Sequence, residues 1–215
     1  MNTLKNISEA PTPKPIVYNV VNTFPGCVSA SKSAELMGFD IPDRYTPEGD
    51  PGYQFRKPIL SDVTAWWLIG CKSEGLFLTG PSGSGKSSII REICARLNLP
   101  MQHMVGHNRL EFPEMVSQIH LVSGQTRVLL GPLAKAMKYG HVFLLDEVDL
   151  IDPSTNAALN EVLQGNALTI PETGEVIRPH ATFRFIATGN THGGQDRTGV
   201  YQGTLNLPRP KGRGF

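Results

Sequence analysis

An eight-residue glycine-rich segment, Gly80–Ser87 (GPSGSGKS), constrains the fold of this chain more than any other feature. It satisfies the pattern G-x-x-x-x-G-K-[ST] at every position. The apolar run GLFLT precedes it, and apolar residues at helical spacing follow it as far as Asn98, so the segment is predicted to link a strand to a helix. In that setting the N–H groups of the loop and the positive end of the helix converge, which favours binding of a phosphate group.

Two side chains of this segment have specific predicted roles. Lys86 is expected to neutralise the β- and γ-phosphates of a nucleotide, and the Ser87 hydroxyl is expected to ligate Mg²⁺. A glycine-rich turn with an exposed lysine is the simpler alternative, but it gives no reason for the strand before and the helix after. The predicted nucleotide-binding residues are Gly80, Pro81, Ser82, Gly83, Ser84, Gly85, Lys86, Ser87 and Ser88.

Three polar residues follow two further apolar runs. Asp146 and Glu147 follow the apolar run VFLL at 142–145, and Asn190 follows FRFIATG at 183–189. Polar residues at the carboxyl ends of parallel strands lie on the ligand side of an α/β sheet. We therefore expect Asp146 to hold Mg²⁺, Glu147 to orient or deprotonate an attacking water, and Asn190 to reach the γ-phosphate or that water. A turn residue is the alternative reading of Asn190.

The remaining pattern predicts an α/β fold in which strands alternate with helices and form a parallel sheet covered on both faces. Asp62 is expected to cap a helix that ends at Gly70, and Asp152 to cap one that begins at Pro153. The expected strands are 75–79, 101–105, 141–146 and 182–188, the expected helical pieces include 112–119 and 133–139, and the expected hairpins are 120–130 and 167–177.

Composition divides the chain and excludes several classes of protein. Proline and glycine are frequent before residue 59, so we expect an N-terminal arm and loop-rich lead-in at 1–58, a core at 59–207 and a basic tail at 208–215.

With 20 basic and 19 acidic residues, the chain is not expected to bind nucleic acid. It has neither a signal-peptide pattern nor an apolar run of about 20 residues. We therefore expect a cytoplasmic protein that does not bind membranes. Its three cysteines are expected to be free buried thiols.

These segments resemble the AAA+ ATPases, and within them the MoxR-like group, which includes the ATPase subunits of aerobic cobaltochelatases. Gly80–Ser87 is similar to the Walker A loop, Val142–Glu147 to Walker B, and Asn190 to the sensor-1 residue. The lead-in PGYQFRKP and the stretch VIRPHATFRFIATGNT carry the likeness to the cobaltochelatase subunits. The two hairpins resemble the insert in helix 2 and the hairpin before sensor 1, respectively.

The resemblance implies a P-loop NTPase three-layer sandwich of AAA+ type with two β-hairpin inserts. It also implies Mg²⁺-dependent ATP hydrolysis, a homo-oligomeric ring, and a partner protein that is remodelled or activated, of which a metal chelatase subunit is one candidate.

The resemblance spans roughly residues 24–205, and nothing after it matches the family's arginine finger, fifth core strand and helical lid. We therefore expect a core truncated before the lid, and neither Arg197 nor Arg209 is assigned as a finger. The strand at 75–79 would then have an open edge. The β-prone run IVYNVV at 16–21 is expected to pack near that edge; otherwise the chain should aggregate.

Several other functions fit parts of the sequence. Asp196–Gly199 matches the D-x-x-G element of GTPases, but the chain has no N-K-x-D guanine reader, and Asp146-Glu147 favours water over a metabolite as phosphoryl acceptor. A non-catalytic ATP-binding assembly subunit, lacking finger and lid, remains the main alternative. His103 and His107 are more simply ordinary histidines than metal ligands. Trp66 and Trp67 are more simply explained as residues of a helix packed on the sheet than as a platform on which adenine stacks.

Overall fold

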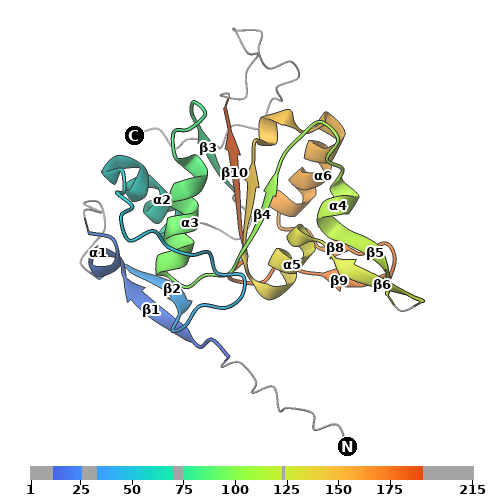
Figure 1. Ribbon diagram of the computed structural model, residues 1–215, viewed down its shortest axis with the longest axis horizontal. Helices are drawn as coiled ribbons and strands as arrows, with labels where there is room; N and C mark the ends of the chain where they lie inside the picture. The colour runs from blue at the N-terminus through green and yellow to red at the C-terminus, as the bar shows by residue number, and fades with distance from the viewer. Residues whose placement is uncertain (1–11, 26–32, 70–74, 123, 191–215) are drawn as a thin grey trace, which may run out of the picture.

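The computed structural model describes residues 12–25, 33–69, 75–122 and 124–190. At its centre is a four-stranded sheet in which every neighbouring pair is parallel (Figure 1). The order across the sheet is β3, β10, β7 and β4. The strands are β3 (Leu76–Thr79), β10 (Arg184–Gly189), β7 (Val142–Asp146) and β4 (Met101–Val105). The predicted α/β class with a parallel sheet is confirmed.

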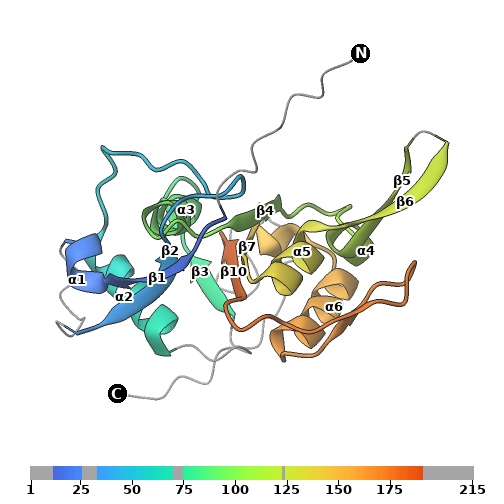
Figure 2. The ribbon, with the colours of Figure 1, turned by 90° about the horizontal axis from the view of Figure 1, so that it is seen from below.

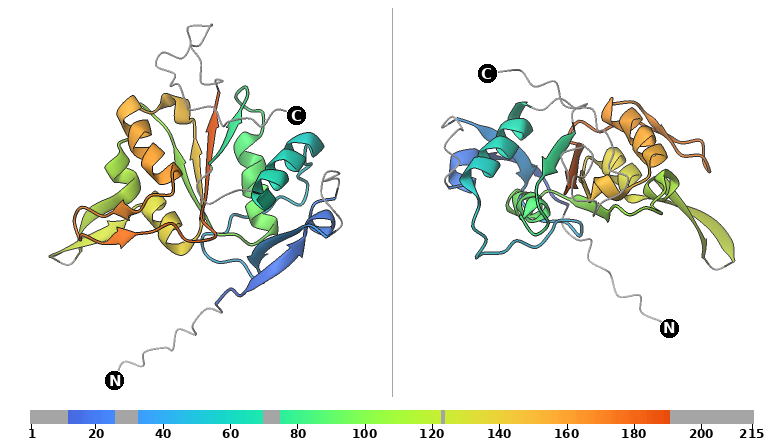
Figure 3. Two further views of the ribbon diagram at one scale, coloured as in Figure 1. Left: turned by 180° about the vertical axis from the view of Figure 1, so that it is seen from behind. Right: turned by 90° about the horizontal axis from the view of Figure 1, so that it is seen from above.

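Helices cover both faces of the sheet and give the three predicted layers (Figures 2 and 3). Successive strand residues point to opposite faces, so Leu144 packs with Ile90 in one apolar cluster, whereas Phe143 packs with Met137 in the other. One face carries α2 (Lys57–Ile69) and α3 (Lys86–Arg96). The other face carries α4 (Phe112–Val116), α5 (Pro132–Tyr139) and α6 (Pro153–Leu163). As expected, α6 begins at Pro153, and Asp152 caps it by accepting the Ser154 N–H at 2.8 Å.

Both predicted hairpins are present. The longer one, β5 (Ser117–Val122) with β6 (Gln125–Leu130), projects beyond α4, as Figure 2 shows. The shorter one pairs β8 (Leu168–Thr169) with β9 (Val176–Ile177). The predicted helix at 112–119 is too long. Residues 117–119 pair with residues 128–130 as strand, so α4 ends at Val116.

The run at 16–21 does not pair with the edge of β3, and aggregation of the chain stays a prediction. The first part of the run belongs to β1 (Pro15–Asn19), which pairs antiparallel with β2 (Glu35–Phe39) in a separate two-stranded sheet. The strand β1 ends at Asn19 because this residue caps α1 (Val20–Thr23), accepting the Asn22 N–H at 3.1 Å. Within the described residues, β3 pairs with β10 alone.

The small N-terminal sheet lies against the carboxyl end of α3 (Figure 1). The N–H of Phe39 donates to the Leu97 carbonyl at 3.0 Å, and the Asn98 side chain donates to both the Phe39 carbonyl and the Tyr18 hydroxyl. Phe24 and Leu36 are buried in the same apolar cluster as α3. The described part of the lead-in therefore packs on the helix that follows the glycine loop, while the domain boundaries themselves stay a prediction.

The predicted start of α2 is also wrong. The helix begins at Lys57 rather than after Asp62, with Pro58 in its first turn. Proline had favoured a loop here, but a first-turn residue needs no N–H for the helix, so proline is tolerated at that position. Trp66 and Trp67 lie on this helix with ring centroids 5.7 Å apart, and both pack in the apolar cluster it shares with α3.

Some predictions concern residues that lie partly or wholly outside the described ranges. They include most of the arm, Cys27, Cys71, Arg197, Arg209 and the basic tail at 208–215. Of the cysteines, Cys94 is described: it is free and fully buried on α3, and burial raises the pKa of its thiol. None of the helices in the described ranges is long and apolar enough to cross a membrane.

Candidate functional site

The glycine loop connects β3 to α3 and turns with the help of two left-handed glycines. Gly83 has φ of 73° and Gly85 has φ of 83°, a region that side chains with a Cβ rarely adopt. Gly85 is also the N-cap of α3 and supplies no side-chain acceptor, so the N–H groups of the first turn are not capped by that residue. This exposed positive helix end can accept an anion.

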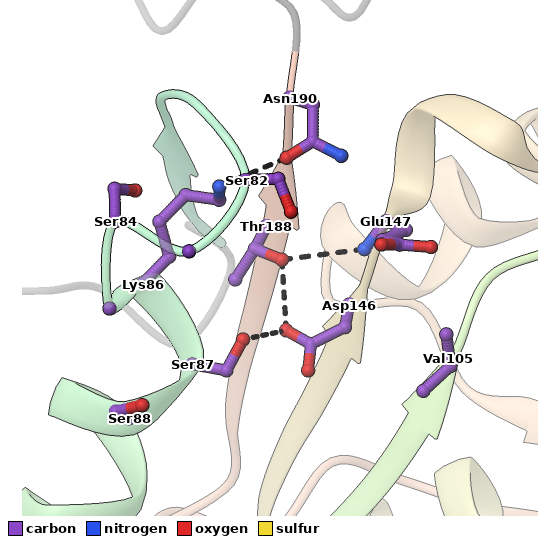
Figure 4. A pocket seen from close by; sticks show the side chains of 12 residues that line it. Ser82, Ser84, Lys86, Ser87, Ser88, Val105, Asp146, Glu147, Thr188 and Asn190 are labelled. Carbon is purple, nitrogen blue, oxygen red and sulfur yellow. Dashed lines mark hydrogen bonds between the residues drawn. The ribbon is translucent and has the colours of Figure 1, made fainter.

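The Lys86 ammonium bridges the loop and the end of β10. Its Nζ donates to the carbonyl of Gly80 at 2.8 Å and to that of Pro81 at 3.0 Å. It also donates to Asn190 Oδ1 at 3.1 Å (Figure 4). These three acceptors are all neutral oxygens, so they do not cancel the lysine charge. The lysine therefore holds a positive charge at the N-terminus of α3, where it can bind a phosphate group.

The Asp146 carboxylate is held by hydrogen bonds to both of its oxygens. Oδ1 accepts the hydroxyls of Ser87 at 2.5 Å and Thr188 at 2.8 Å, as Figure 4 shows, and Oδ2 lies 2.7 Å from Nε2 of His103. Burial alone raises the pKa of Asp146, but the hydrogen bonds from His103, Ser87 and Thr188 together outweigh it. The pKa therefore lies below its usual value, and the carboxylate is ionised at neutral pH.

Glu147 and Asn190 leave their strands in conformations fixed by neighbouring residues. Glu147 is a non-glycine residue in the left-handed region, with φ of 54°, and its N–H donates to Thr188 Oγ1 at 3.3 Å. The N–H of Asn190 donates to Asp149 Oδ2 at 3.1 Å. Backbone strain of this kind persists only where the surrounding structure enforces it, and it is common at functional sites.

One pocket of about 280 Å³ brings most of the predicted residues together. It lies at the carboxyl end of the sheet, between the glycine loop, β7 and the end of β10 (Figure 4). Of the predicted residues, it is lined by Ser82, Gly83, Ser84, Gly85, Lys86, Ser87, Ser88, Asp146, Glu147 and Asn190. Gly80 and Pro81 do not line it, and their carbonyls instead hold the lysine.

Besides Val105, sequence reasoning missed three polar residues that line this pocket or contact its lining. Thr188 contacts both Asp146 and Glu147, Asp149 anchors Asn190, and His103 contacts Asp146 from β4. The positions of Thr188 and Asp149 carried a signal, because each is a polar residue within three positions of a predicted site residue. His103 carried none, since its contact depends on the strand order.

The donor set suits Mg²⁺ and a phosphate ligand. A serine hydroxyl and an ionised carboxylate are oxygen donors of the kind that Mg²⁺ prefers, and the uncapped helix end provides N–H donors for phosphate oxygens. His107 does not join this set, because its Nδ1 accepts the Arg109 N–H at 3.2 Å. Across the ranges that the structure describes, no three His, Cys, Asp or Glu side chains form a separate metal site.

Comparison with curated proteins finds several relatives. The chain is 32% identical over 176 residues to the aerobic cobaltochelatase subunit CobS of Sinorhizobium sp., covering 77% of this chain and 50% of that protein. It is 34% identical over 148 residues to the uncharacterized protein YojN of Bacillus subtilis, covering 66% and 48%. A third match, midasin of Giardia intestinalis, is 33% identical over 121 residues, covering 55% and 2%. The chain thus spans about half the length of CobS and YojN, and a small part of midasin.

A family model settles the relationship. The model of the AAA domain, dynein-related subfamily, matches residues 75–201, which is more than half of the chain. The match includes β3, the glycine loop, β7 and β10, and hence the elements that surround the pocket. The resemblance inferred from the sequence motifs is confirmed, and the chain belongs to the AAA domain family, dynein-related subfamily.

Proposed function

We propose that this chain binds ATP with Mg²⁺ in the pocket at the end of the sheet and hydrolyses the ATP. The observation that carries the proposal is the convergence of Lys86, Asp146, Glu147 and Asn190 on one 280 Å³ pocket beside the uncapped start of α3. Membership of the AAA domain family supports nucleotide binding in general. The choice of ATP and the residue roles below are our own inference.

In this proposal the loop and α3 bind the phosphates. Lys86 turns from its carbonyl partners toward the β- and γ-phosphates, while N–H groups at the start of α3 donate to phosphate oxygens. Bound Mg²⁺ would neutralise charge that develops on the phosphates. Ser87 and Asp146, already joined by a hydrogen bond of 2.5 Å, would hold it. The pairing fits because the serine oxygen can offer a lone pair to a metal while its O–H still donates to the carboxylate.

Glu147 is the proposed general base. Its carboxylate would accept a proton from the water that attacks the γ-phosphorus, and the constrained backbone at this residue keeps its position fixed. Asn190 would orient that water or the γ-phosphate from the neighbouring strand. Its contact with Lys86 already joins the two sides of the pocket at 3.1 Å.

We further propose that hydrolysis remodels or activates a partner protein, with the chain acting in a homo-oligomeric ring. The relationship to a cobaltochelatase subunit supports a metal chelatase complex as one candidate partner. The chain spans about half of that relative, so the complete activity rests on this proposal rather than on the comparison.

The proposal is tested by Glu147→Gln, which keeps the side-chain shape but removes the base. ATP affinity should stay within about threefold of wild type. Single-turnover hydrolysis should fall by roughly 100-fold or more, the usual contribution of a general base. Glu161→Gln, an exposed site on α6, is the matched control and should change neither quantity.

The same experiment separates an ATPase from an ATP-binding assembly subunit. Wild-type protein that binds ATP but shows no single-turnover hydrolysis would favour the assembly subunit. Hydrolysis at the wild-type rate by Glu147→Gln would instead show that the base lies elsewhere.

A further inference from the structure

His103 contacts the pocket residue Asp146 from a strand that no motif marks. It lies on β4, which pairs with β7 in parallel so that His103 is opposite Leu144 and Val105 is opposite Asp146. Side chains at alternate strand positions share a face, so His103 and Asp146 both project toward the α3 side of the sheet. The strand order therefore places an imidazole beside the carboxylate of Asp146.

The contacts of the imidazole place it between a carboxylate and an arginine. The ionised Asp146 carboxylate can only accept, so His103 Nε2 carries a proton and donates to Oδ2 at 2.7 Å. A guanidinium nitrogen of Arg91 lies 2.9 Å from Nδ1 and 3.5 Å from Nε2. Because the Nδ1 lone pair points outward in the ring plane, a nitrogen this close to both ring nitrogens lies over the face of the ring. Arg91 therefore packs on the imidazole from α3, while Nε2 faces Asp146.

The remaining contacts of Asp146 explain why this donor matters. Ser87 and Thr188 both donate to Oδ1, whereas His103 makes the one hydrogen bond to Oδ2 among the described residues. With both oxygens bonded, rotation of the carboxylate about its Cβ–Cγ bond is opposed from two sides. The His103 side chain is 27% exposed and that of Asp146 is 13% exposed, so solvent does not readily replace the bond.

We propose that His103 is a positioning residue for the Mg²⁺ site, holding the Asp146 carboxylate through the hydrogen bond that Nε2 donates. This inference rests on the proposed function, since it concerns the metal that Asp146 and Ser87 would hold. Residues that orient a metal ligand from behind typically contribute 10–100-fold to metal affinity. The contribution should be absent when no metal is present.

The test measures affinity for a fluorescent ATP analogue across a Mg²⁺ series and in EDTA. His103→Ala should raise the half-saturating Mg²⁺ concentration about tenfold or more. Its affinity in EDTA should stay within about twofold of wild type. His103→Gln can place an amide N–H near the position of Nε2 and should recover most of the loss. His120→Ala, at an exposed histidine of β5, is the matched control and should match wild type.

Each other result overturns the proposal. An unchanged half-saturating Mg²⁺ concentration in His103→Ala would show that the hydrogen bond contributes nothing to Mg²⁺ binding. An equal loss in EDTA would indicate a purely structural role, and failure of His103→Gln to recover would exclude the Nε2 donor. If wild-type protein itself bound the analogue without any response to Mg²⁺, the proposed metal site would fail together with this inference.

A second measurement does not depend on nucleotide binding. Nitrogen-15 spectra distinguish protonated from unprotonated ring nitrogens, and the wild-type protein without nucleotide should show a proton on His103 Nε2. An unprotonated Nε2 would contradict the bond to Asp146 and overturn the proposal even if the fold and the ATP site were intact.

Discussion

At the scale of single residues, Asp146 joins three parts of the molecule. It accepts bonds from Ser87 on α3, Thr188 on β10 and His103 on β4. All three partners donate, and an ionised carboxylate can accept from all of them because it has no proton of its own. The sequence predicted the carboxylate and the serine from their motifs. It could not predict His103, because the contact requires β4 to lie beside β7.

Asp146→Asn should remove the contribution of Mg²⁺ to ATP affinity. The amide loses the negative charge, and its NH₂ group must face one of three donors, so the metal loses a ligand and the local contacts are disturbed. Calorimetric titration of ATP should give the same affinity with Mg²⁺ as with EDTA, whereas wild type should bind at least tenfold more tightly with Mg²⁺. Asp62→Asn, exposed on α2, is the control. A normal Mg²⁺ response in Asp146→Asn would place the metal elsewhere.

At the scale of elements, α3 connects the phosphate loop to the N-terminal segment. The buried Glu92 carboxylate accepts from the Asp50 N–H at 2.9 Å and from Arg96 Nε at 2.9 Å, while the Arg96 guanidinium lies 4.8 Å from the Phe55 ring centroid. Helix periodicity predicted α3 itself. It could not predict that the lead-in packs on this helix, because loop composition says little about where a loop lies.

Glu92→Ala should therefore loosen the lead-in from α3 and lower the free energy of unfolding by about 1–3 kcal/mol, because it removes the two hydrogen bonds that the buried carboxylate accepts. Urea denaturation followed by circular dichroism measures this change. Glu161→Ala, an exposed glutamate of α6, should shift it by no more than about 0.5 kcal/mol. Equal stability of the two variants would mean that the Glu92 contacts do not hold the segment.

At the scale of the whole molecule, the sequence predicted the layers better than the strand partners. Alternation of strands and helices was enough to predict a parallel sheet covered on both faces, and local apolar runs located all four strands. The run at 16–21 supplies most of β1, which pairs with β2 and not with the edge of β3. The sequence could not predict that partner, because β-propensity marks a strand without naming its neighbour.

The central claim concerns one pocket, formed where the parallel strands end and α3 begins, and Lys86→Ala tests it most directly. Calorimetric titration with ATP and Mg²⁺ should show affinity at least tenfold weaker than wild type, about 1.4 kcal/mol, because the variant lacks the only cation that the described residues place in the pocket lining. Lys57→Ala, at an exposed lysine of α2, should bind ATP as wild type does. Unchanged affinity in Lys86→Ala, with the fold intact by circular dichroism, would contradict the assignment of the glycine loop as the phosphate site.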